Sequence, residues 1–215
     1  MVNYARMGRT SDAKDRLMTA TLDLIWEGSY GAITIDDICN RSEVKKGSFY
    51  YFFDSKADLA IAALERLWTE TWKPGLDNLF SPSIEPLKRI TDYLEFIYKK
   101  QAESKERFGK VLGCPVCSLG SEVSTQEEKL SAKVRELYSR KRGYIESAIR
   151  DAVTEGAIEP CDPLEKTASL FGLIEGVVTQ GRIMNDPEVS RQLPAMALDL
   201  LRVRSVAAQV AAYPA

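Results

Sequence analysis

The sequence of 215 residues contains no histidine. This absence excludes Ser-His-Asp triads, Cys-His dyads and every metal site that needs an imidazole ligand. Neither of the two common glycine-rich phosphate loops is present. Carboxylate and lysine chemistry stay open, but these absences favour a protein that is not an enzyme and that holds no cofactor and no metal.

Long hydrophobic runs are also missing. No stretch approaches the roughly 20 apolar residues of a membrane span, and the first ten residues hold no apolar run of signal-peptide length. We therefore expect a cytoplasmic protein with no membrane partner. Because the cytosol keeps thiols reduced, we do not interpret the four cysteines as a disulfide framework. The net charge of -2 means that any positive surface for nucleic acid must be local.

The composition, 45% hydrophobic and 28% charged, is ordinary for a globular protein. Apolar residues recur at helical spacing, and alternation of period two is never sustained. The pattern predicts an all-α fold of about nine helices, with a break where prolines and glycine cluster at 73–86. The longer helices are expected at about 12–27, 55–68, 87–102, 126–155, 164–184 and 189–212.

Two short helices joined by a tight turn form a helix-turn-helix candidate at 35–53. Thr34 is the predicted N-cap of the first helix, and the acidic residues in its first turn suit the helix dipole. In the second helix, Phe49 and Phe53 are spaced to face inward as anchors. This arrangement leaves the opposite face of the second helix for DNA.

The start of the second helix carries the chemistry that binds nucleic acid. Lys45 and Lys46 lie beside exposed backbone N–H groups, which together favour phosphate. Gly47 lets the backbone approach a duplex closely, and the Ser48 hydroxyl can bond to a base edge or a phosphate. Further hydroxyl and ammonium donors follow at Tyr50, Tyr51 and Lys56.

The run from Val44 to Leu59, Val-Lys-Lys-Gly-Ser-Phe-Tyr-Tyr-Phe-Phe-Asp-Ser-Lys-Ala-Asp-Leu, resembles the signature of the TetR family of transcriptional regulators. The preceding residues 31–38 also match this family's way of beginning its second helix. The resemblance is close over residues 12–67. Phe52 departs from the pattern, since it stands where the family often has His or Tyr.

The resemblance implies a DNA-binding domain at 1–56 and a ligand-binding and dimerisation domain at 57–215. It implies a repressor that a small-molecule effector releases from a near-palindromic double-stranded DNA operator, although activation stays open. Family positions that touch DNA are occupied by Thr34, Lys46, Gly47, Ser48, Tyr50, Tyr51 and Lys56, to which charge adds Lys45. It also implies a homodimer through the two C-terminal helices. The candidate interface residues are Leu170, Gly172, Leu173, Ile174, Gly176, Val177, Val178, Leu193, Met196, Ala197, Leu200, Leu201 and Val203.

The effector pocket is predicted from aromatic residues and two cysteines: Trp68, Trp72, Tyr93, Phe96, Cys114, Cys117, Tyr144 and Phe171. Cys114 and Cys117 flank the expected helix start at Pro115, where thiols can be activated or bind a soft metal. One alternative is therefore a repressor that senses oxidants, electrophiles or soft metals through this pair; another is that the cysteines only pack. A dithiol oxidoreductase is a remote third reading, because no βαβ pattern surrounds the pair.

Overall fold

The computed structural model describes residues 4–123 and 127–203, and this part of the chain is helical with one isolated bridge between Ile158 and Val203. The all-α prediction is confirmed. The elements are α1 (Tyr4–Glu27), α2 (Ile35–Ser42), α3 (Lys46–Phe52), α4 (Lys56–Leu67), a π-helix (Trp68–Trp72), α5 (Lys73–Leu79), α6 (Pro86–Phe108), α7 (Pro115–Val123), α8 (Glu128–Thr154), α9 (Pro163–Met184), a 3-10 helix (Pro187–Gln192) and α10 (Leu193–Leu201).

The chain forms two compact units. Unit 1 comprises residues 1–73 and 115–137, and unit 2 comprises 74–114 and 138–215. The helix α8 belongs to both units, because its residues up to 137 lie in unit 1 and the rest in unit 2. The two compact units therefore do not meet at residue 56, where the boundary between the functional domains was expected. In the structure, α4, α7 and the start of α8 belong to the same unit as the first three helices.

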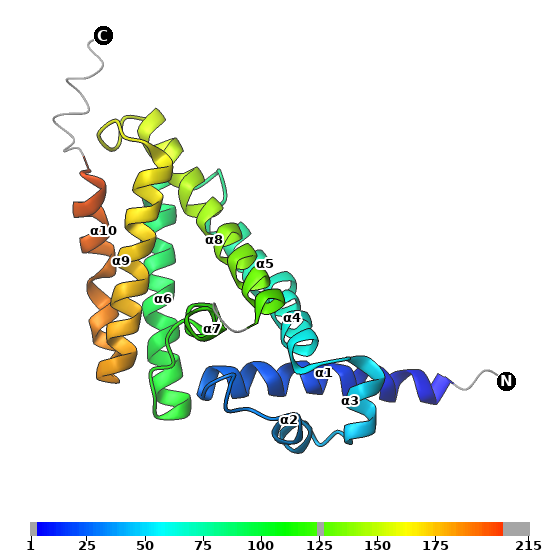
Figure 1. Cartoon of the computed structure of the whole chain (residues 1–215). Helices are drawn as coiled ribbons and strands as arrows, with labels where there is room; N and C mark the ends of the chain where they lie inside the picture. Colours follow the sequence, from blue (N-terminus) through cyan, green and yellow to red (C-terminus); the bar gives the residue numbers. More distant parts are fainter. Residues whose placement is uncertain (1–3, 124–126, 204–215) are drawn as a thin grey trace, which may run out of the picture. The chain divides into compact units, whose positions relative to one another are not determined.

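Unit 1 is built around α1, which packs against α2, α3 and α4 (Figure 1). The core residues Leu17, Ile38, Phe49 and Leu59 have no exposed surface. Burial of such side chains stabilises by about 1.5–3 kcal/mol each. This core matters because α2 and α3 have only eight and seven residues, too short to be stable as isolated helices in water.

The break expected at 73–86 is shorter than predicted, because helical structure continues through Pro74 to Leu79. The reason is the π-helix just before the proline. There the N–H of Lys73 bonds to the carbonyl of Trp68, five residues back instead of four. Such a wider turn accommodates a residue without an N–H, which would interrupt an ordinary helical ladder. The observed break is confined to residues 80–85.

In unit 2, α10 packs against α6 and α9, so that the three helices lie side by side (Figure 1). Arg89 of α6 is 4% exposed, donates to the carbonyls of Pro82 and Ile84, and pairs with Asp151 at 2.5 Å. Through these contacts the Arg89 guanidinium ties the loop that precedes α6 to the helix α8.

Within the described residues, no helix is long and apolar enough to cross a bilayer.

Two predicted boundaries were wrong. The first helix begins at Tyr4 instead of residue 12. The predicted last helix is a 3-10 turn followed by α10, which ends at Leu201, where Arg202 adopts a left-handed conformation with φ 52°. The rest of that prediction, residues 204–212, lies outside the described residues.

Candidate DNA-binding interface and sensing segment

The helix α3 presents two chemically different faces. Phe49 is fully buried, whereas the side chains of Tyr50 and Tyr51 are 53% and 75% exposed. The three residues Lys45, Lys46 and Gly47 at its start are exposed, and Ser48 is half-buried. Six of the eight predicted DNA contacts thus lie on α3 or at its N-cap, whereas Thr34 caps α2 and Lys56 begins α4.

Aromatic packing holds this helix in place. The rings of Phe49 and Phe53 are 6.2 Å apart and those of Phe49 and Tyr50 are 5.0 Å apart in an edge-to-face arrangement. Phe53 is also buried. The predicted inward pair is therefore confirmed, and Tyr50 is fixed by its ring while its hydroxyl end stays exposed.

Thr34 caps α2 as predicted, through a reciprocal capping box. Its hydroxyl accepts from the N–H of Asp37 at 3.1 Å, and its own N–H donates to Oδ2 of Asp37 at 2.9 Å. The Thr34 hydroxyl also donates to Oδ2 at 2.6 Å. Hydrogen bonds from the Thr34 side chain and then its backbone lower the pKa of Asp37. Thr34 remains a predicted DNA contact, with an exposed side chain already engaged in the cap.

Lys46 forms an ion pair with Asp36 of α2, with Nζ and Oδ1 2.8 Å apart. The hydrogen bond and charge of Asp36 raise the pKa of Lys46. If Lys46 contacts a phosphate as predicted, that contact has to replace an exposed ion pair of modest strength.

Lys56, the first residue of α4, is engaged with its own unit. Its ammonium donates to the carbonyls of Tyr30 and Ile33, both at 2.8 Å, and lies 4.1 Å from the centroid of the Tyr30 ring. Burial lowers the pKa of Lys56, although Glu122 and Glu127 act in the opposite direction. An ammonium has three hydrogens, so the predicted phosphate contact would use the third.

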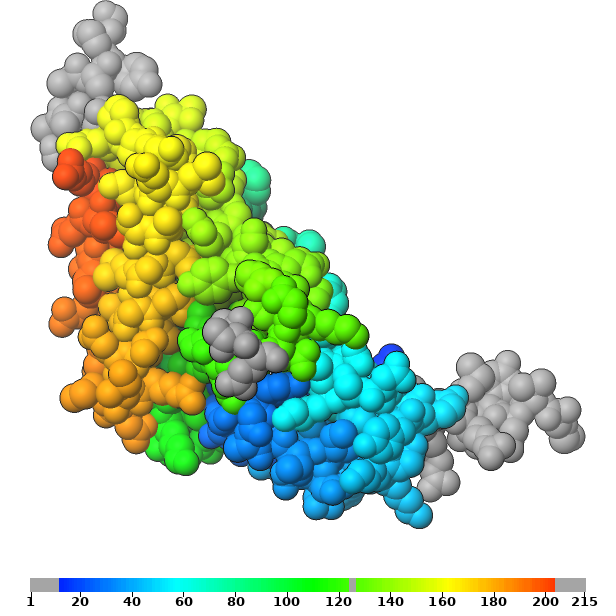
Figure 2. Space-filling view, in the orientation of Figure 1, coloured from blue at the N-terminus to red at the C-terminus, as the bar shows by residue number. Residues whose placement is uncertain are grey.

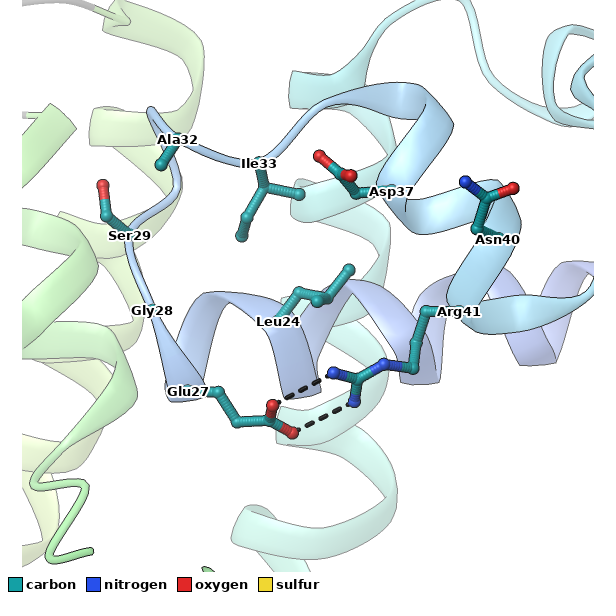
Figure 3. Close-up of a pocket in the computed structure, with 9 residues that line it drawn as sticks. All are labelled: Leu24, Glu27, Gly28, Ser29, Ala32, Ile33, Asp37, Asn40 and Arg41. Atoms are coloured by element: carbon teal, nitrogen blue, oxygen red, sulfur yellow. Dashed lines mark hydrogen bonds and ion pairs between the residues drawn. The ribbon is translucent and has the colours of Figure 1, made fainter.

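An open pocket of about 460 Å³ lies in unit 1 between the end of α1, the following loop and α2 (Figure 3). Its lining comprises Leu24, Glu27, Gly28, Ser29, Ala32, Ile33, Asp37, Asn40 and Arg41. Arg41 donates to both carboxylate oxygens of Glu27 at 3.1 Å. None of the residues predicted to line an effector pocket belongs to it.

The residues predicted for the effector pocket are divided between the two units. Trp68, Trp72 and Cys117 belong to unit 1, and the others to unit 2. In unit 2, the Tyr93 and Tyr144 rings both contact Phe80, at 5.4 and 5.6 Å between centroids. Phe96 is elsewhere, 40% exposed under the ammonium of Lys100.

Lys141 of α8 brings several of these unit 2 residues together. Its Nζ is 3.8 Å from Sγ of Cys114 and 5.8 Å from the centroid of the Phe171 ring. It also hydrogen-bonds to buried Tyr93, whose pKa burial raises while Lys141 opposes that rise. Lys141 could not be identified from the sequence, because a lysine in a strongly charged helix looks like part of a solvated face.

The loop that leads to Cys114 is fixed by side chains of unit 2. The Ser104 hydroxyl donates to the carbonyl of Lys110 and accepts from the N–H of Leu112, and Gln101 accepts from the N–H of Gly113 at 3.0 Å. Both Gln101 and Ser104 are buried. As predicted, α7 begins at Pro115, directly after Cys114, and places Cys117 in its first turn. Both cysteines are half-buried, and neither is in a disulfide.

Comparison with known proteins agrees with this architecture. Residues 17–63 match the family described as bacterial regulatory proteins, tetR family, and residues 86–196 match the tetracyclin repressor-like C-terminal domain. An uncharacterized HTH-type transcriptional regulator from the lacX 3' region of Lactococcus lactis subsp. lactis is 31% identical over 131 residues, which span 60% of this chain and 63% of that protein.

Two further relatives match over more of their length. The transcriptional regulator AcuR of Cereibacter sphaeroides is 28% identical over 194 residues, 85% of each chain. The crystal structure of the reduced form of Escherichia coli NemR superposes with a TM-score of 0.77 at 22% identity, over 91% of this chain and 100% of that one. The second family match alone spans more than half of the sequence, from α6 into α10. The chain is a transcriptional regulator of the TetR family.

Proposed function

We propose that this chain is a homodimeric repressor that binds a near-palindromic duplex through α3 and is released by a small-molecule effector. The observation that carries the DNA-binding part is the two-faced α3, with Phe49 fully buried and Tyr51 75% exposed. A helix of this kind at the second position of a helix-turn-helix reads the major groove. Two such helices in a two-fold dimer match two half-sites.

Gly47 supports a close approach of DNA at this face. A Cβ added to Gly47 would meet no atom of the described chain within 4 Å. Packing inside the protein therefore does not call for a glycine at this exposed first turn. A glycine here would instead let a phosphate or base edge lie directly against the backbone N–H groups, which is a reason for its presence.

Of the residues predicted for the dimer interface, Gly172, Gly176 and Met196 are exposed in the single chain, whereas seven others are buried. Leu170, Ile174, Val177 and Val178 are at most 5% exposed within the single chain, and Leu193, Ala197 and Leu201 at most 1%. They form the chain's own core. On α9, the residues left exposed at helical spacing are Ala168, Gly172, Gly176 and Ile183.

This exposed strip has the character of a helix-pairing surface. A Cβ on Gly172 or Gly176 would meet nothing within 4 Å in the described chain, so a second helix can approach the backbone closely. Ile183 is 74% exposed and Met196 of α10 is 38% exposed. The surfaces of α9, yellow to orange, and α10, orange to red, adjoin in Figure 2. We propose that this strip joins two copies.

The experiment selects a binding site from random duplexes with the purified chain and measures its affinity by fluorescence anisotropy. We expect one near-palindromic site, bound by a dimer in sedimentation, and loss of binding in Tyr51→Ala. Lys99→Ala, an exposed lysine in α6, is the matched control and should bind normally. Recovery of no preferred duplex would refute the proposal, and a reporter placed behind the selected site separates repression from activation.

A second candidate for the signal is a thiol reagent, because Lys141 lies 3.8 Å from the sulfur of Cys114. A neighbouring cation stabilises a thiolate, which is the reactive form. If this candidate holds, N-ethylmaleimide or diamide releases wild type from DNA but not the Cys114→Ser/Cys117→Ser variant. Cys161→Ser, a half-buried cysteine outside the segment, is the control. Equal release of all three proteins would show that the pair only packs and would favour a conventional ligand.

A further inference from the structure

Glu122, near the end of α7, accepts three hydrogen bonds from the turn between α1 and α2. The Ser29 hydroxyl and the Gly31 N–H donate to Oε1 at 2.6 and 2.5 Å, and the Tyr30 N–H donates to Oε2 at 3.0 Å. The residues that meet here are more than 90 positions apart in the sequence and belong to the same unit. Backbone donors that converge on one carboxylate define the position of a turn more narrowly than van der Waals contact does.

Lys56 also contacts this turn. The Lys56 ammonium donates hydrogen bonds to the carbonyls of Tyr30 and Ile33. Glu122 accepts hydrogen bonds from backbone N–H groups of the same turn. Both the donors and the acceptors of the turn are thus bound by side chains of opposite charge. Thr34, the cap of α2, follows directly. The position of the turn therefore fixes where the helix-turn-helix begins relative to α1.

Glu122 is itself held firmly. Val116, Leu119 and Val123 of α7 are at most 2% exposed. A Cβ on Gly120 would lie 2.9 Å from Cγ1 of Val134, so α7 and α8 approach each other closely at this point. The Glu122 carboxylate is thus attached to a well-packed helix. Its hydrogen bonds link the position of the turn to the position of α7.

We propose that Glu122 is a positioning residue for operator recognition, which holds the Ser29–Gly31 turn so that α2 and α3 are presented to the duplex in the correct arrangement. This inference rests on the proposed DNA-binding function. It assigns to α7 an indirect role in reading DNA, although α7 begins at Pro115 and α3 ends at Phe52.

Two independent variants break the contact. Glu122→Gln keeps the shape of the side chain but places an N–H₂ group where one of the two carboxylate oxygens accepts hydrogen bonds. Gly31→Ala disturbs the same contact from the side of the turn, because the Cβ of the new alanine would lie 2.9 Å from Oε1 of Glu122. That oxygen ends a flexible side chain, so the added methyl group displaces the carboxylate without disturbing the core. Glu70→Gln, an exposed glutamate of unit 1, is the matched control for the loss of charge.

The test measures dissociation constants on the selected operator and on a random duplex of equal length. We expect Glu122→Gln and Gly31→Ala each to lower the ratio of operator to random affinity about tenfold, as for one lost charged hydrogen bond. The double variant should lose no more than either single one, because both remove the same contact. Glu70→Gln should keep the ratio within about twofold, an effect too small to count as a lost hydrogen bond.

Whether DNA affinity rises or falls in Glu122→Gln distinguishes a positioning role from a general electrostatic effect. Removal of a negative charge strengthens binding to a polyanion, so a general charge effect would tighten both complexes in Glu122→Gln and Glu70→Gln alike. Positioning weakens the operator complex only. Amide exchange at Tyr30 and Gly31 should also accelerate in Glu122→Gln, while exchange at core residues such as Leu59 stays slow.

An unchanged affinity ratio in both variants, with a wild type that selects an operator, overturns this inference and leaves the proposed function standing. A wild type that selects no operator overturns the proposed function, and the inference with it.

Discussion

Loss of the Thr34 hydroxyl tests whether the cap of α2 is needed for stability, for DNA binding or for both. Thr34→Ala removes one acceptor for the N–H of Asp37 and one donor to its carboxylate, whereas the backbone bond from Thr34 to Asp37 can persist. An N-cap substituted by alanine costs about 0.5–2 kcal/mol. Because half of the capping box survives, we expect about 1 kcal/mol, which corresponds to about 2–4 °C in the melting temperature for a chain of this size.

The assay combines urea unfolding with operator affinity, measured at a temperature where every variant is folded. Thr34→Ser and Thr34→Asn retain a capping oxygen and should keep wild-type stability. If the Thr34 hydroxyl also contacts a phosphate, Thr34→Ser keeps operator affinity and Thr34→Ala weakens it. Wild-type stability in Thr34→Ala would refute the argument that these hydrogen bonds hold the start of α2.

The same variant has a pH signature. The native pKa of Asp37 is lowered by its bonds to Thr34, so the carboxylate stabilises the fold above its unfolded pKa, and this contribution is lost as pH falls through the native value. The stability difference between wild type and Thr34→Ala should therefore be largest near neutral pH and shrink toward pH 3. A difference that grows in acid would contradict the assignment.

Three further outcomes are expected. Phe49→Ala should destabilise unit 1 by about 3–5 kcal/mol in urea unfolding, because its ring has no exposed surface, whereas Tyr51→Ala should change stability by no more than about 0.5 kcal/mol while weakening DNA binding. Asp36→Asn should free Lys46 from its ion pair and tighten binding to operator and random duplexes alike; tightening on the operator alone would contradict a phosphate role. Burial raises the pKa of Glu122, but its hydrogen bonds and Lys56 outweigh that and lower it overall, so Glu122→Gln should cost more stability at pH 7 than at pH 3 in parallel urea titrations.

What the sequence could predict was local. Phe49 and Phe53 are four residues apart and share a helical face, so their burial and the exposure of Tyr51 follow from helical periodicity. Thr34 as a cap and Pro115 as a first helical residue follow from rules that involve only a few neighbouring positions. The two faces of α3 were therefore predictable from the sequence, whereas the role of its exposed face in DNA binding stays a prediction.

The sequence could not predict which surface of the protein covers each apolar side chain, because this depends on the tertiary structure. Leu170 and Ile174 are as apolar as an interface requires, but apolarity does not say which surface covers a side chain, and the chain's own core uses them. Gly172 and Gly176, which the sequence also suggested for the interface, are the members of that set that stay exposed on α9. The π-helix before Pro74 likewise reflects a local change of hydrogen-bond register that no residue pattern announces.

The contacts of Glu122 and Lys141 show why sensing and reading are hard to assign from composition in this chain. Each is a charged residue on a helix with other polar residues, and each becomes informative only through partners far away in the sequence. The loop at 110–113 is fixed within unit 2 by Gln101 and Ser104, and α7, which follows after one residue, is tied within unit 1 to the turn before α2. Neither Gln101, Ser104 nor Glu122 is distinguished by residue type alone, so each of these contacts is recognised only from the folded chain.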